Sequence, residues 1–134
     1  MKHHGSKFPP FTDLFILTKE DFADGFDGTT IELLTAKAGD VLLPAQLIEV
    51  KKIVAGPSDV PTAQITIGEE EISEPLELGA LNLSFSQTDY ILGTDTVEIL
   101  FDKADGNGAA ATAGEIWIWL AISRKRDRCA QVVK

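Results

Sequence analysis

Turn signals recur along this chain at roughly the 8–12-residue spacing that is typical of β-sandwiches and barrels. The clearest are Asp24-Gly25, Gly56-Pro57 and Asp105-Gly106. The apolar segments between them are short, and none keeps a helical period long enough for a helix that joins parallel strands. The spacing therefore predicts an all-β chain of about seven or eight strands, folded as an antiparallel two-sheet sandwich of jelly-roll type.

Alternation of apolar and polar residues locates the strands. The long run 41–54 is predicted to be a strand and not a helix, because Pro44 breaks a helix and β-branched residues such as Ile48 and Val50 favour strands. Pro44 also predicts a strand edge or a bulge at that point. The expected strands cover residues 14–18, 29–35, 41–54, 62–68, 79–86, 96–102 and 114–123.

The last strand, Gly114–Ser123, is apolar on both faces. One face carries Ile116, Ile118, Leu120 and Ile122, and the other carries Trp117, Trp119 and Ala121. A strand with one solvated face would alternate apolar with polar residues. We expect the isoleucine face to join the core. The tryptophan face has three interpretations: burial within the subunit, cover by a partner, or stacking on a sugar.

The chain divides into an N-terminal arm (1–13), a sandwich domain (14–123) and a basic tail (124–134). The arm holds Phe8-Pro9-Pro10-Phe11, where consecutive prolines exclude a helix and favour extended polyproline geometry. The flanking aromatic rings predict a docking segment, which binds either its own domain or a partner.

Charge is unevenly distributed along the chain. The total is −9, and the tail carries five basic residues against Asp127, a net +4, which leaves −13 for residues 1–123. An acidic body argues against nonspecific nucleic-acid binding. The tail is either a solubilising segment or an electrostatic contact to a partner. The candidate contact residues in it are Arg124, Lys125, Arg126 and Arg128.

The inventory of reactive residues argues against catalysis. His3 and His4 are the only histidines and Cys129 is the only cysteine, so the β body cannot build a Ser-His-Asp unit or a zinc site of its own. No phosphate-binding or dinucleotide-binding glycine motif occurs. We therefore expect no enzyme activity, no cofactor and no metal. Carboxylates are plentiful, but a domain of this size has little room for both a cleft and a core.

Calcium is the remaining metal to consider. Several oxygen-bearing residues lie in predicted turns, but their spacing does not match a calcium-binding loop, and turn formation explains them. They are Asp24, Asp27, Asp102, Asp105 and Asn107. No apolar run is long enough to cross a membrane, and the N-terminus lacks the apolar segment of a secretory signal. We expect no membrane association.

Three segments resemble the head decoration (cement) proteins of tailed bacteriophages. They are Gly39-Asp40-Val41-Leu42-Leu43, Ala63-Gln64-Ile65-Thr66-Ile67-Gly68 and Ala113-Gly114-Glu115-Ile116-Trp117-Ile118. They correspond in that family to a Gly-Asp turn leading into a long strand, to a strand end, and to the final strand. The resemblance spans roughly residues 29–123 and consists of strand ends and turns, without a catalytic signature.

The resemblance implies a jelly-roll protein on the outer surface of a virion, made in the host bacterial cytoplasm. It implies binding to the major capsid protein and a homo-oligomer, a trimer in that family. The lone cysteine, which cannot form an internal disulfide, is consistent with a reducing cytosol. Two alternatives stay open. One is another virion β-module, such as a head fibre base or tail accessory, and the other is a carbohydrate-binding module that uses Trp117 and Trp119.

Overall fold

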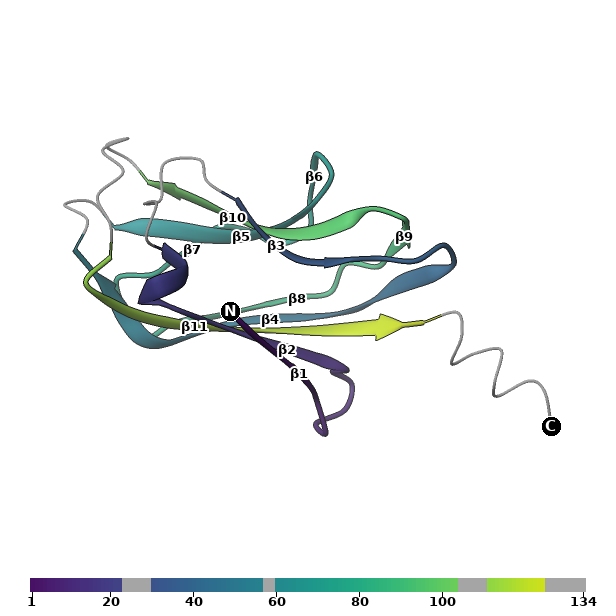
Figure 1. Ribbon diagram of the computed structural model, residues 1–134, viewed down its shortest axis with the longest axis horizontal. Coiled ribbons are helices and arrows are strands. Elements are labelled where there is room, and N and C mark those ends of the chain that lie inside the picture. Colours follow the sequence, from purple (N-terminus) through teal and green to yellow (C-terminus); the bar gives the residue numbers. More distant parts are fainter. Residues whose placement is uncertain (23–29, 57–59, 104–110, 125–134) are drawn as a thin grey trace.

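Two antiparallel sheets stack face to face in the computed structural model, which describes residues 1–22, 30–56, 60–103 and 111–124 (Figure 1). Sheet A has the order β1-β2-β11-β4-β8, and β9 also pairs with β4. Its strands are β1 (Lys2–Gly5), β2 (Asp13–Thr18), β4 (Asp40–Ala55), β8 (Leu83–Ser86), β9 (Tyr90–Gly93) and β11 (Ala113–Ser123). Within the described residues, no helix is long and apolar enough to cross a membrane.

Sheet B has the order β3-β10-β5-β6, and β7 also pairs with β5. Its strands are β3 (Thr30–Thr35), β5 (Pro61–Ile67), β6 (Glu70–Glu71), β7 (Leu76–Glu77) and β10 (Thr96–Lys103). A single 3-10 turn, η1 (Lys19–Phe22), follows β2.

Strands that follow each other along the chain mostly lie in opposite sheets. Sheet A receives β2, β4, β8 and β11, whereas sheet B receives β3, β5 and β10. Figure 1 shows these two groups as a lower and an upper layer. This interleaving is that of a double-sheet jelly roll. The predicted all-β, two-sheet antiparallel sandwich is confirmed.

The core lies between the two inner faces. From β11, Ile116, Ile118, Leu120 and Ile122 all point inward and are buried, which confirms the predicted role of the isoleucine face. They meet buried side chains of sheet B that alternate along β5, as the pattern of residues 62–68 predicted, and along β10. These sheet B residues are Ala63, Ile65, Ile67, Val97, Ile99 and Phe101.

Strand β4 is confirmed as a strand with a bulge at Pro44. Its pairing with β11 passes from Leu42↔Ile122 to Gln46↔Leu120, so three residues of β4 face one of β11. A proline cannot donate to the ladder, and the bulge removes the need for a donor there. The buried Gln46 amide closes the bulge, because it donates to the carbonyl oxygens of Leu43 (2.7 Å) and Thr88 (2.9 Å).

Five elements differ from the sequence prediction, and three of them are the short strands β6, β7 and β9, which were not expected. The strand expected over 79–86 is regular only in β8, Leu83–Ser86. Strand β1 was not predicted, because Lys2–Gly5 is polar and has no apolar alternation. It forms by pairing with β2, from Lys2↔Ile16 to Gly5↔Asp13.

Candidate functional site

The outer face of sheet A, which points away from sheet B, is apolar across four strands. Residues that pair across antiparallel strands point to the same face. Two rows of pairs cross the outer face, Leu14–Trp119–Leu47–Phe85 and Ile16–Trp117–Glu49–Leu83. Glu49 is the only charged member of these eight residues.

On β8 and β9 the apolar side chains of this face are exposed to solvent. Phe85 is 52% exposed, Leu83 is 65% exposed, and Ile91, which pairs with Val41, is 78% exposed. Leu43, in the bulge of β4, is also exposed. We call Leu43, Leu47, Leu83, Phe85 and Ile91 the apolar patch. Exposed hydrophobic side chains that are contiguous on a monomer mark sites of interaction.

The outer face of sheet B is different, because polar residues dominate it. Its rows of pairs are Glu32–Glu98–Thr66 and Thr30–Leu100–Gln64, with Asp102–Thr62 beyond them. The outer side of sheet B is thus polar and its inner side apolar, although Gln64 and Thr66 on β5 are themselves buried. The two outer faces of the sandwich therefore differ in character, and only that of sheet A is apolar across adjacent strands.

Trp119 is covered by the N-terminal arm of its own subunit. The side chain is only 9% exposed, and the rings of Phe11 and Phe8 lie 5.7 and 6.0 Å from its ring, centroid to centroid. Its indole N–H donates to Glu49 Oε1 at 2.7 Å, so the buried polar group has a partner. Of the three interpretations of the tryptophan face, burial within the subunit is the correct one for Trp119.

Trp117 is half-buried and bears polar neighbours. The Lys51 ammonium lies 4.7 Å from the ring centroid, a cation–π contact. The indole N–H donates to Glu115 Oε2 at 2.8 Å, and Lys51 also pairs with Glu49 at 3.0 Å. One face of the ring is therefore occupied by a side chain of the same subunit, and Trp117 and Trp119 do not form a bare stacking platform.

The arm is folded back and is not the extended polyproline segment that its sequence predicted. The Phe11 N–H donates to the Phe8 carbonyl at 3.0 Å and closes a tight turn around a cis Pro9–Pro10 bond. The reversal allows β1 to pair with β2 and brings both phenylalanine rings to Trp119. Phe8 stays largely exposed at the margin of this cluster.

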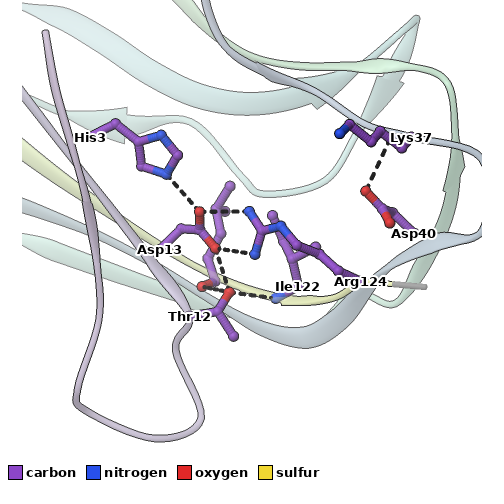
Figure 2. A network of polar contacts seen from close by, with 8 residues as sticks. His3, Thr12, Asp13, Lys37, Asp40, Ile122 and Arg124 are labelled. Carbon is purple, nitrogen blue, oxygen red and sulfur yellow. Dashed lines mark hydrogen bonds and ion pairs between the residues drawn. The ribbon is translucent and has the colours of Figure 1, made fainter. Parts of the chain in front are cut away.

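A buried carboxylate, Asp13, ties the arm to the end of β11 (Figure 2). It accepts two hydrogen bonds from the Arg124 guanidinium, at 3.0 and 2.8 Å, and His3 Nε2 lies 2.6 Å from its Oδ2. The Thr12 hydroxyl donates to the same carboxylate and accepts from the Ile122 N–H at 3.0 Å. His3 also stacks on Phe15, with centroids 4.2 Å apart.

The pKa of Asp13 lies below its ordinary value. Burial alone would raise the pKa, but hydrogen bonds from Arg124, Thr12 and His3, together with the positive charge of Arg124, outweigh burial and favour the ionised form. Arg124 thus binds a carboxylate of its own subunit, where its position in a basic tail suggested a contact to a partner. The other tail candidates, Lys125, Arg126 and Arg128, lie outside the described residues.

Of the candidate calcium residues, only Asp102 lies within the described part of the chain. Asp24, Asp27, Asp105 and Asn107 lie outside the described residues, and Asp102 is an exposed residue near the end of β10. In the part of the chain that the structure describes, no three residues of the His, Cys, Asp and Glu types are grouped as metal ligands.

The apolar patch was not identified from sequence. The alternation over 79–86 did place Leu81, Leu83 and Phe85 on one face, which is the usual signal of a core strand. Alternation does not distinguish the inner face of a sheet from its outer face. Only the pairing of β8 with β4 shows that Leu83 and Phe85 point outward.

No family model and no curated protein matches this chain in sequence. Among solved structures, the C-terminal domain of EclA, a sugar-binding protein, is 15% identical with a TM-score of 0.41, over 82% of this chain and 76% of that one. The T13 IBDV viral particle is 16% identical with a TM-score of 0.41, over 87% and 35%. The Gx strain of infectious bursal disease virus is 14% identical with a TM-score of 0.37, over 83% and 34%. Similarities at this level show neither sugar binding nor a place in a viral particle for this chain.

Proposed function

We propose that this chain is a non-enzymatic virion structural protein that binds the outer surface of a bacteriophage capsid and stabilises it by bridging major capsid protein subunits. The observation that carries the proposal is the apolar outer face of sheet A, opposite the polar outer face of sheet B. A one-sided apolar surface suits a module that sits on a larger body with its other side in water.

The physics of such binding is simple. Each copy removes apolar surface from water at a seam, which is worth about 25 cal/mol per Å² before the costs of association. Many weak contacts on a closed shell act together, so avidity exceeds the affinity of one site. The segments 39–43, 63–68 and 113–118, which resemble capsid decoration proteins, support this partner.

The test uses capsids assembled without the protein. Purified protein titrated onto them should bind to saturation, and the loaded capsids should withstand higher temperature than bare ones. Absence of binding to the capsid at any concentration would contradict the proposal. Labelling of the tail alone would favour a tail or head-fibre module instead.

A carbohydrate-binding module is the second candidate, and one observation favours it. A hollow of about 500 Å³ lies on sheet A, lined by Glu49, Val50, Lys51 and residues 81–83, and Lys51 also contacts Trp117. A glycan array should then detect ligands that Trp117→Ala loses. Glycan signals that are equal for the wild type, Trp117→Ala and Trp119→Ala would reject this candidate.

A further inference from the structure

Strand β8 is an edge strand without the usual protection against pairing. It is the last strand of sheet A among those that the structure describes, with β4 on one side only. Natural edge strands commonly carry charges, prolines or bulges that prevent another strand from adding to them. Between Leu78 and Thr88 the chain has no charged residue and no proline, although 25% of all its residues are charged.

The main-chain groups of Leu83 and Phe85 point to the open edge. The Val50 N–H donates to the Asn82 carbonyl at 2.9 Å, and hydrogen-bonded positions alternate along an antiparallel ladder. Asn82, Ser84 and Ser86 therefore face β4, and the two apolar residues between them direct their N–H and C=O groups away from it. A hollow of about 380 Å³, lined by residues 71–75 and by Ser84–Ser86, leaves space beside the strand.

The sequence of β8 is complementary to itself. If two copies of β8 run antiparallel with Ser84 on the twofold axis, Leu83 faces Phe85 of the second copy, and each of these two pairs exchanges both main-chain hydrogen bonds. The apolar side chains of both copies then lie on the same outer face. A shift of the axis to Phe85 would instead place Leu83 opposite Gln87. An axis on Leu83 would pair Phe85 with Leu81, which precedes β8, so the axis on Ser84 is the register that matches apolar with apolar side chains within β8 itself.

The absence of charge on β8 itself permits a second copy at this edge. Each chain carries a net −9, so two copies repel unless their contact is free of carboxylates. The residues of β8 itself are uncharged, but Glu71 and Glu74 line the hollow beside Ser84–Ser86. The nearest paired carboxylate, Glu49 on β4, is already bound to the Trp119 indole and the Lys51 ammonium. The paired strands themselves therefore bring no like charges together, and the repulsion that the two copies must overcome comes from Glu71 and Glu74 beside the seam.

We propose that two copies of this chain pair through β8 and join their A sheets into one continuous antiparallel sheet. The pairing is separate from the proposed capsid contact, because it uses the edge of the sheet and not its face. It also places two apolar patches side by side on one surface. An edge of four residues buries less than the ~1,200 Å² of a standard interface, so the dimer is weak and depends on concentration.

Analytical ultracentrifugation of the full chain from about 1 to 200 µM tests this inference, since weak dimers fall in that range of dissociation constants. The wild type should shift from monomer to dimer. Leu83→Pro removes an edge donor without removing a bond to β4, and Phe85→Lys adds an edge charge; each should raise the dissociation constant at least tenfold. Ile91→Lys, which adds the same charge to the apolar patch on β9, should leave the dimer intact.

Hydrogen exchange gives a second readout that does not depend on any variant. The amides of Leu83 and Phe85 should exchange more slowly as the dimer forms, whereas the Ser84 amide, already bonded to β4, should change little. A wild type that stays monomeric overturns the inference, as does an equal dimer for Leu83→Pro and Phe85→Lys. Loss of the dimer in Ile91→Lys alone would assign the contact to the face and would also overturn it. Capsid binding is measured separately, so the two proposals fail independently.

Discussion

Asp13 and Arg124 form the residue-scale link between the start and the end of the described chain. The carboxylate is 3% exposed and binds the guanidinium through two hydrogen bonds. Removing one partner of a buried pair leaves an uncompensated charge. We expect Arg124→Met to lower the free energy of unfolding by about 2–4 kcal/mol.

Urea denaturation at pH 7 measures this effect. Lys51→Met is the control, because its ion pair with Glu49 and its cation–π contact with Trp117 are at the surface, where each is worth no more than about 1 kcal/mol. Adding Asp13→Asn to Arg124→Met should recover part of the loss. A change below about 0.5 kcal/mol for Arg124→Met, under the value of an ordinary hydrogen bond, would show that the pair does not stabilise the fold.

The depressed pKa of Asp13 predicts a dependence of stability on pH. A carboxyl group whose pKa is lower in the folded state stabilises the fold above the pKa of the unfolded chain, near 3.8. That contribution is lost as the pH falls through the folded pKa, which lies below 3.8. The difference in unfolding free energy between the wild type and Asp13→Asn should therefore be constant near pH 6 and shrink below pH 3.8. A difference that stays the same down to pH 2 would contradict the proposed cause.

At the scale of elements, the N-terminal arm behaves as a cover for Trp119. Phe11 is half-buried against the indole, whereas Phe8 is largely exposed at a similar distance. We expect Phe11→Ala to shift tryptophan emission to longer wavelength and to lower the unfolding free energy by about 1–3 kcal/mol. Phe8→Ala is the matched control and should change both quantities less. Equal emission in both variants and the wild type would show that the arm does not shield Trp119.

Sequence patterns predicted where the strands lie better than which segments pair with or contact one another. Alternation and turn spacing located β5, β10 and β11, and Pro44 correctly marked a bulge in β4. The same patterns missed β1, because a polar strand that forms only by pairing leaves no periodic signal. The turn at Pro9-Pro10 was missed for a related reason: tertiary contact with Trp119 and pairing of β1 with β2 decide its geometry, and neither is local in sequence.

The candidate site was only partly predictable. The apolar faces of β11 identified Trp117 and Trp119 as unusual, but their surroundings come from Glu49, Lys51, Phe8 and Phe11, which are distant in sequence. The exposed residues of the apolar patch looked like core residues, since alternation reports a face and not its direction. Arg124 was grouped with the basic tail, as a solubilising or partner-contacting residue, because its own partner, Asp13, is distant in sequence.

At the scale of the whole molecule, the sandwich has one polar and one apolar outer face. The outer face of sheet B carries Thr, Glu and Gln side chains. Sheet A instead exposes Leu43, Leu83, Phe85 and Ile91 to solvent. An uncovered apolar face makes a chain prone to self-association, and a partner that covers the face removes that tendency. The two faces thus offer a matched comparison within one molecule.

That comparison tests the central claim, which is that the outer face of sheet A is the surface that binds the capsid. The measurement is the affinity of Ile91→Lys and Thr62→Lys for capsids assembled without the protein. Both add one positive charge, the first on sheet A and the second on the outer face of sheet B. We expect Ile91→Lys to weaken binding at least tenfold and Thr62→Lys to bind as the wild type does. Equal affinity of the two variants, or loss of binding in Thr62→Lys alone, would contradict the claim.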